Sequence, residues 1–398
     1  MLVVLRKNNS RNIRFKENLE VLVRKKMLNV CRVISSHRIL VVLTGFLLVA
    51  VFIFIDTKML VCKRTEINVS SEQNDKLSGR MFIDRKNHLL YCSVPKIGST
   101  FMKRLLLILS GKMKKSSIVE IKTKLAHKIR LENVNILDIN SASINGCFAN
   151  FYKLLVVRNP YERLYSAYLD KFVRPNGLYY KLGKKIIKMF RSNPSSQSLS
   201  CGDDVTFPEF IKYFIYSLQT GNLTDPHFIP IHMLCQPCLF DYKVIRLEDI
   251  SVELPKFLHS IGINFISPSD YLKETRLLDE AKHIEYLFER NSPLVKNCLS
   301  STEVLRRLWK RDQIRGFIKT NYSFPLEDIL LPHLPKTQIF KMFFSYYQMS
   351  YRKDRRASYR TAMLAAYSQL SPRDFQLTQQ YLETDCKLFG YKSLQMEY

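Results

Sequence analysis

Acidic residues are scarce in this chain, and their scarcity is the first constraint on what it binds. Its 398 residues include 35 Asp and Glu against 62 Lys and Arg, which gives a formal net charge of +27 and a pI near 9.7. Such a balance favours an anionic partner, which would be nucleic acid, a membrane surface or an acidic polysaccharide. The sequence has no zinc-finger, RNA-recognition or helix-turn-helix pattern, so we expect no nucleic-acid partner.

Several motifs are also missing, and each absence removes a class of chemistry. The G-x-x-x-x-G-K-[ST] loop of nucleotide hydrolases does not occur, nor does the Asp-x-Asp metal motif that many glycosyltransferases use. Among nine cysteines, Cys235 and Cys238 form the one Cys-x-x-Cys pair, and no second pair or His pair completes a zinc site. We therefore expect no metal, and structural disulfides at these two cysteines with partners that the spacing leaves open.

The N-terminus carries the pattern of a membrane anchor. Residues 1–38 hold ten Lys and Arg against two Glu, and residues 39–55 follow as seventeen uncharged, mostly apolar residues. Seventeen is at the short end for a spanning helix and suits a thin early-secretory bilayer. The long basic leader disfavours a cleaved signal peptide, and its charge predicts a cytoplasmic N-terminus. The expectation is a single-pass type II anchor.

Beyond the anchor we expect a lumenal region. Residues 56–80 are polar and without periodicity, which is typical of a stem, and residues 81–398 form the remaining domain. Three glycosylation sequons agree with a lumenal position, although such tripeptides are also common by chance; they begin at Asn68, Asn222 and Asn321.

A strand–loop–helix stretch at residues 88–110 has the pattern of an anion cradle. Leu89–Val94 is an apolar run ended by Pro95, which predicts a buried strand, and Thr100–Ser110 has apolar residues at helical spacing. Between them Gly98 allows a tight bend, so that backbone N–H groups and the positive end of a helix face one point. The cationic and hydroxyl side chains in or beside the loop are Lys96, Ser99, Thr100, Lys103 and Arg104.

A second stretch repeats this arrangement. Leu154–Val157 predicts another buried strand, Arg158 stands at its carboxyl end, and a helix is expected over Tyr161–Phe172, with Arg163 and Ser166 on it. A guanidinium binds phosphate oxygens as a fork, and parallel sheets bind ligands at the carboxyl ends of their strands. One basic loop would be read most simply as a solvated connection. Two of them indicate a ligand with an anionic group at each end.

Three further local signals place elements along the chain. Tyr242–Leu247 reads as a third buried strand. Thr206 with Glu209 predicts a capping box for the helix that follows, and Ser371 before Pro372 predicts the start of the last helix.

These blocks together resemble the Golgi carbohydrate sulfotransferases. Leu89–Leu106 is similar to their 5′-phosphosulfate loop, and Val157–Phe172 to their 3′-phosphate motif R-x-P-x-x-R-x-x-S-A-Y. Asp225–Ile250 resembles a third block of the group that acts on chondroitin, dermatan and related glycans, and Tyr381–Tyr391 resembles its closing helix. The resemblance covers residues 89–272 and about 362–391.

The resemblance implies a fold and an activity. The fold would be a P-loop-NTPase-like three-layer α/β sandwich with a central parallel sheet. The reaction would transfer a sulfuryl group from 3′-phosphoadenosine 5′-phosphosulfate (PAPS) to a hydroxyl of an anionic or neutral glycan such as chondroitin, in the Golgi lumen and without a metal. An inactive glycan-binding relative is the alternative, but such a protein need not retain Lys96 and Arg158, and both are present. The oligomeric state is left open.

The resemblance also assigns roles to residues. Lys96 would stabilise the leaving phosphate, and His227 or Glu248 would be the general base. Two plainer interpretations stay open: His227 as a packed histidine that anchors the loop at Pro230, and Glu248 as a helix cap or a partner of Arg246. The donor-binding set is Pro95, Lys96, Ile97, Gly98, Ser99, Thr100, Lys103 and Arg104 for the 5′ end, with Arg158, Arg163 and Ser166 for the 3′-phosphate.

Three regions are not explained by the motifs. Residues 272–360 diverge from the family pattern, and form either an insertion that shapes the acceptor site or a docking surface. The lysines of residues 112–128 fit a solvated helix face as well as they fit a groove for an acidic glycan. A further basic run at residues 181–191 leads into the serine-rich residues 192–200, where we expect a mobile loop near the acceptor.

Overall fold

The computed structural model describes six ranges of the chain, all within the second of its two units, Met1–Arg64 and Thr65–Tyr398. No helix in these ranges is long and apolar enough to cross a membrane, and the expected anchor at 39–55 and nearly all of the stem lie outside them. The ranges are 80–114, 118–136, 148–264, 276–325, 335–350 and 355–395.

A mixed sheet organises the described residues. Its order is β3-β1-β2-β4-β5, where β2, β4 and β5 are parallel and β1 is antiparallel to both β2 and β3. The central parallel sheet is therefore confirmed, while the antiparallel edge was not expected from the sequence. The strands are β1 Arg80–Asp84, β2 Leu89–Cys92, β3 Asn133–Asn135, β4 Tyr152–Val157 and β5 Lys243–Arg246.

Burial follows the position of each strand in the sheet. All four residues of β2 and the last four of β4 are buried, as their continuous apolar runs predict for central parallel strands. The third predicted strand is confirmed as β5, parallel to β4, but its predicted burial is wrong. In β5 only Ile245 is buried, because this strand is the edge of the described sheet and exposes Lys243, Val244 and Arg246.

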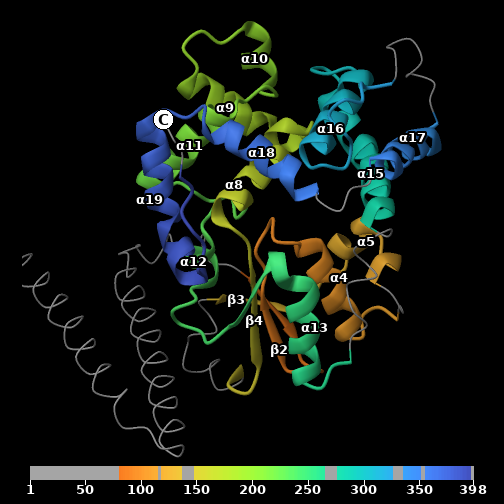
Figure 1. Cartoon of the computed structure of the whole chain (residues 1–398), viewed down its shortest axis with the longest axis vertical. Helices are drawn as coiled ribbons and strands as arrows, with labels where there is room; N and C mark the ends of the chain where they lie inside the picture. The colour runs from red at the N-terminus through yellow and green to blue at the C-terminus, as the bar shows by residue number, and fades with distance from the viewer. Residues whose placement is uncertain are drawn as a thin grey trace, which may run out of the picture. The chain divides into compact units, whose positions relative to one another are not determined.

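In Figure 1, α4 and α13 lie beside the strands, while α9, α10 and α11 are grouped together beyond one end of the sheet, as are α15, α16 and α17. Short 3-10 or π turns join several of them: Ile118–Glu120, η3 Leu169–Val173, η4 Gly177–Tyr179 and Leu247–Asp249. The helices are α4 Ser99–Leu109, α5 Thr123–Lys128, α8 Pro160–Tyr168, α9 Tyr180–Phe190, α10 Ser196–Cys201, α11 Phe207–Gln219, α12 Ile231–Cys235, α13 Ile250–Ser260, α15 Arg276–Val295, α16 Ser301–Ile314, α17 Lys336–Met349, α18 Arg355–Tyr367 and α19 Pro372–Phe389.

The predicted helix starts are confirmed. The Thr206 side chain accepts from the Glu209 N–H and the Glu209 carboxylate accepts from the Thr206 N–H, which is a complete capping box. Ser371 likewise caps α19 by accepting from the Asp374 N–H at 3.1 Å. The expected loop at 192–200 is wrong, because residues 196–201 form α10 and its last residue is in a disulfide with Cys298.

Disulfides join segments that are far apart in sequence. Cys92 at the end of β2 pairs with Cys235 of α12, and Cys238 is also disulfide-bonded, so the structural role expected for the Cys-x-x-Cys pair is confirmed. Cys386 is a buried free thiol.

The described part of the divergent region is helical and has a core of its own. Apolar residues of α15, α16 and α17, among them Ile284, Leu308 and Phe343, form a second buried cluster. Arg311 bridges Glu280 at 2.7 Å and Asp312 at 2.6 Å inside it. The cluster is joined to the rest of the domain by the Cys201–Cys298 disulfide and by ion pairs Arg307–Asp203 and Arg104–Asp279.

The last helix is fixed to α12 by one buried carboxylate. Asp385 accepts from the N–H groups of Ile231 at 2.7 Å and His232 at 2.8 Å, and from His232 Nδ1 at 2.8 Å. Burial opposes its charge, yet these partners hold the pKa of Asp385 below its usual value.

We predict that Asp385→Ala lowers the free energy of unfolding by about 3–5 kcal/mol, because it leaves buried donors without an acceptor. Since the folded-state pKa is depressed, this contribution is present above the unfolded value of about 3.9 and is lost as the pH falls through the folded value. Urea denaturation at pH 7 tests this, with Glu383→Ala in an exposed pair on the same helix as the control. An equal effect of both changes would contradict the prediction.

Candidate active site

The loop between β2 and α4 has the geometry of an anion cradle. Gly98 caps α4 with φ 82°, and no side chain caps the first turn of the helix. Lys96 also lies in the left-handed region, at φ 69°. Such a conformation is uncommon for a residue with a side chain and is enriched at functional sites. Ile97 between them is fully buried, which anchors the loop.

Arg158 brings the second basic stretch to the same loop. It follows β4, the parallel neighbour of β2, and its Nη1 donates to the Lys96 carbonyl at 3.3 Å. The guanidinium also contacts Glu162 at 3.3 Å and lies 5.2 Å from the centre of the Tyr359 ring. Burial opposes its charge, but Tyr359 and Glu162 outweigh burial and raise the pKa of Arg158. The two predicted anion-binding stretches therefore meet.

Arg163 supports the loop through hydrogen bonds to backbone carbonyls. It is 3% exposed, and its guanidinium donates to the carbonyls of Pro95 at 3.1 Å, Ile229 at 2.7 Å and Pro226 at 2.9 Å. Burial lowers its pKa to about 10, so it remains charged at neutral pH. The predicted role in phosphate binding is not supported, because these donors are bonded to backbone carbonyls. Ser166, the serine predicted to bind the 3′-phosphate, is half-buried on α8.

Arg104 is also separated from the predicted set. Its side chain is 1% exposed and donates to both oxygens of Asp279 at 2.8 and 2.9 Å and to Thr123 at 3.0 Å. It is thus a packing residue between α4 and α15, and the expected donor contact is not supported. Thr100 and Lys103 lie in the first turns of α4, and both side chains contact His127: Thr100 Oγ1 is 3.2 Å from Nε2, and Lys103 Nζ is 3.4 Å from Nδ1.

Lys96 belongs to a cluster of three cations around one carboxylate. Asp170 lies 3.2 Å from Lys96, 3.2 Å from Lys171 and 3.0 Å from Arg174. Burial opposes the charge of Asp170, but the three cations hold its pKa well below the usual range. Burial lowers the pKa of Lys96 to about 8, and Asp170 restores it only in part. Lys96 is therefore charged at neutral pH with little margin.

His227 has the surroundings of a general base. Its Nδ1 is 2.6 Å from Asp225, whose other oxygen accepts from the Tyr179 hydroxyl at 2.7 Å. This arrangement favours the tautomer with the proton on Nδ1, so that Nε2 is the acceptor. Burial lowers the pKa of His227, Asp225 raises it in part, and the charges of Lys171 and Lys96 lower it further. The imidazole is therefore neutral near pH 7.

Both carboxylate oxygens of Glu248 are held by hydrogen bonds or ion pairs to other parts of the domain. Its carboxylate accepts from the Tyr391 hydroxyl at 2.8 Å and from the Asn159 N–H at 3.4 Å, and Arg356 lies 3.4 Å away. The open alternative of a pair with Arg246 is wrong, since Arg246 donates to the carbonyls of residues 389 and 390 instead.

The sequence interpretation missed five residues of this arrangement. Asp225 had a usable signal, because it stands two residues before His227 in a block already singled out. The others gave no signal: the charges of Asp170, Lys171 and Arg174 in and after η3 look like an ordinary solvated turn, and the Tyr179 hydroxyl finds its partner only through tertiary packing. The five are Asp170, Lys171, Arg174, Tyr179 and Asp225.

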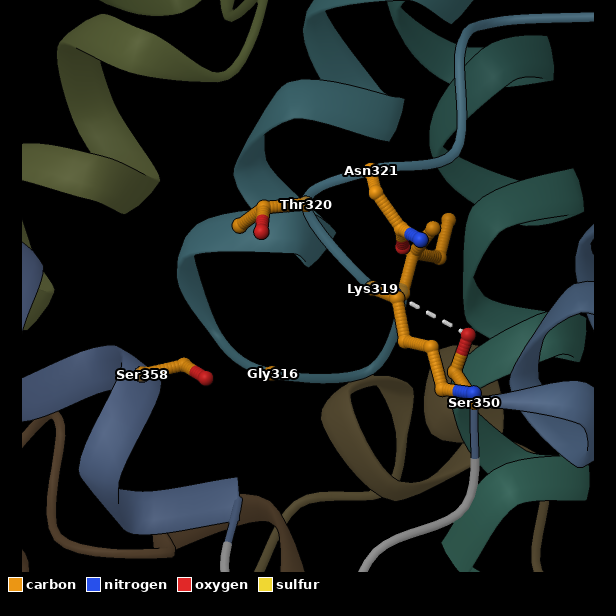
Figure 2. Close-up of a pocket in the computed structure, with 7 residues that line it drawn as sticks. Gly316, Lys319, Thr320, Asn321, Ser350 and Ser358 are labelled. Atoms are coloured by element: carbon orange, nitrogen blue, oxygen red, sulfur yellow. Dashed lines mark hydrogen bonds between the residues drawn. The ribbon is translucent and has the colours of Figure 1, made fainter.

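A pocket of about 140 Å³ lies apart from these residues, in the divergent region (Figure 2). The N–H of Lys319 donates to Ser350 Oγ at 3.0 Å across its rim. Its volume is below that of ordinary small-molecule sites, and no predicted site residue lines it. The lining residues are Gly316, Ile318, Lys319, Thr320, Asn321, Ser350 and Ser358. The six described ranges hold no cluster of His, Cys, Asp or Glu suited to a metal ion.

Comparison with known proteins identifies relatives. The chain is 34% identical to carbohydrate sulfotransferase 11 of Rattus norvegicus over 208 residues, which is 50% of this chain and 58% of the relative. Identity to human carbohydrate sulfotransferase 8 is 35% over 185 residues, 46% of this chain and 42% of that one. The chain is also 33% identical to carbohydrate sulfotransferase 14 of Danio rerio over 196 residues, which is 49% of this chain and 52% of the relative. The chain thus spans about half the length of the curated relatives it matches.

No solved structure matches the chain. The model of the sulfotransferase family matches residues 79–313, which contain β2, β4, the two basic stretches, Asp170 and His227. That match covers 235 of the 398 residues, and the chain therefore belongs to the sulfotransferase family.

Proposed function

We propose that this protein transfers a sulfuryl group from PAPS to a hydroxyl of a glycan. The observation that carries the proposal is the contact of Arg158 with the Lys96 carbonyl, because it joins two anion-binding stretches at the carboxyl ends of adjacent parallel strands. PAPS has anionic groups at both ends of its nucleoside, which suits two such stretches. The relatives named carbohydrate sulfotransferases support a glycan acceptor.

Binding of the donor would divide between the two stretches. The N–H groups of Ser99 and Thr100 at the start of α4, with the two hydroxyls, would hold the 5′-phosphosulfate. Arg158 and Ser166 would hold the 3′-phosphate, and Lys103 would add positive charge beside the helix. Arg163 and the buried side chain of Ile97 would support the loop from behind.

The transfer step would depend on charge and position. The acceptor oxygen attacks sulfur in line with the departing phosphate oxygen, the new O–S bond forms as the old one breaks, and the acceptor proton passes to His227 Nε2. Lys96 stabilises the negative charge on the departing phosphate. Asp225 holds the imidazole in the accepting tautomer and stabilises its protonated form.

The wider setting extends the proposal. The fold would be the three-layer P-loop-NTPase-like sandwich, and residues 39–55 would anchor the enzyme in the Golgi membrane with residues 81–398 in the lumen. The basic leader and the sequons support this orientation, and chondroitin is the acceptor that the motif blocks favour.

We predict that Arg158→Ala weakens binding of 3′-phosphoadenosine 5′-phosphate about tenfold or more, because a charge-assisted phosphate contact is lost. Isothermal calorimetry on the detergent-solubilised full chain measures this, with the exposed Arg373→Ala as the control. A well-folded wild-type protein that does not bind the nucleotide would contradict the enzymatic proposal and favour an inactive glycan-binding relative.

For the base, we expect His227→Ala to lower kcat by about 10²–10⁴-fold with little change in nucleotide affinity, because only proton transfer is lost. The exposed His259→Ala serves as the matched control. Transfer of label from radioactive PAPS to chondroitin is the assay. A kcat within threefold of wild type would exclude His227 as the base.

The pH profile tests the pairing of Lys96 with Asp170. On the acid side, activity should rise as His227 loses its proton, and because the pKa of His227 is lowered this rise should lie below pH 6.5. On the alkaline side, activity should fall as Lys96, with a pKa of about 8, loses its proton. Asp170 raises the pKa of Lys96, so Asp170→Asn should move the alkaline limb to lower pH and reduce activity more at pH 8 than at pH 6.5. An unmoved alkaline limb, as expected for the control Glu383→Gln, would disprove the coupling.

A further inference from the structure

Helix α9 begins next to the catalytic residues. Tyr179, the last residue of η4, donates to Asp225 at 2.7 Å and lies 3.5 Å from His227 Nδ1. Residue 180 is the first residue of α9, which then extends to Phe190 beside α10 and α11 (Figure 1). The start of this helix is therefore close to His227, where the acceptor hydroxyl would bind.

The exposed face of α9 is mostly lysine, with Met189 as its one exposed apolar residue. Lys181, Lys184, Lys185 and Lys188 are all exposed, and the helix contains no acidic residue. On α11, which packs against α9, Lys212 is exposed as well. We call these five residues the lysine face.

Neighbouring carboxylates do not neutralise the lysine face. Between residues 176 and 219 the acids are Asp203, Asp204 and Glu209. All three are bound by arginines: Arg307 holds the first, and Arg191 holds the other two at 2.6 and 2.7 Å. In the described ranges the five lysines consequently have no ion-pair partner, and like charges at this spacing repel one another unless an anion lies among them.

Their spacing suits an extended anion. Positions 181, 185 and 188 lie on one face of a helix, and they extend over about 10 Å along its axis, with about 6 Å between neighbours. Two tyrosines of α11 accompany them: Lys185 Nζ is 6.0 Å from the ring centre of Tyr213, and Tyr216 is 38% exposed. Cations beside partly exposed rings suit a chain of sugar rings that carries carboxylates.

We propose that the lysine face binds the acidic chain of the glycan acceptor where that chain leaves the catalytic site. This inference rests on the proposed function. Continuity with His227 favours this occupant over an anionic membrane or a nucleic acid, because neither of those needs to reach the base. The lysine face acts on affinity for long acceptors and not on the chemical step.

The test replaces Lys181, Lys185 and Lys188 together with glutamine, which removes charge and keeps helix propensity. A matched control replaces three exposed lysines elsewhere: Lys86, Lys243 and Lys256. With the full chain, PAPS and unsulfated chondroitin polymer, the triple variant should raise KM for the polymer about tenfold, leave kcat and nucleotide affinity unchanged, and show a weaker dependence of binding on salt. The control variant should match wild type.

Three results would overturn the proposal. They are an unchanged KM for the polymer, an equal change in both triple variants, and a loss of binding to phosphatidylserine vesicles or single-stranded RNA without any change for chondroitin. Direct binding of chondroitin, measured by calorimetry without donor, keeps the test separate from the reaction. If the wild-type chain binds no nucleotide, the proposed function fails, while the binding difference between the variants still decides the role of the lysine face.

Discussion

The guanidinium of Arg163 is the contact on which the geometry of the site depends. One buried side chain bonds the carbonyl of Pro95 in the anion loop and the carbonyls of Pro226 and Ile229 on either side of the His227 segment. A buried charge is costly unless its donors are satisfied, so these backbone positions are constrained together. The loop that would bind the donor and the residue that would take the acceptor proton are thus held by the same group.

Next to the backbone segments that Arg163 holds, the carboxylate of Asp170 is balanced by three cations. Lys96 adopts a left-handed backbone conformation and shares Asp170 with two other cations, so its ammonium is held in place before any ligand arrives. An anionic ligand would compete with Asp170 for Lys96, while Lys171 and Arg174 would remain to neutralise that carboxylate. Release of Lys96 would therefore not leave a buried charge without a partner.

The sequence predicted those parts of the fold that depend on local pattern. The strand–loop–helix units and the capping box at Thr206 follow from periodicity and caps, whereas the central parallel sheet was an implication of the family resemblance. The long-range partners did not follow: Arg104 and Arg163 stand in motif positions that suggest a ligand, yet one bonds Asp279 and the other bonds backbone carbonyls. The sequence of a motif does not show whether its basic residue is exposed or buried, because tertiary packing determines the environment of the side chain.

The different uses of arginine and lysine explain how a chain with a net charge of +27 folds and still presents positive charge. In the described ranges, arginines such as Arg191, Arg307 and Arg311 bind carboxylates within the domain. A guanidinium is weakly hydrated and forks onto a carboxylate, whereas an ammonium is strongly hydrated and stays at the surface. Many of the acids are consequently bound by arginines. Lys96 and Lys171 share Asp170, whereas lysines such as Lys181 and Lys188 are exposed and would be available to an external anion.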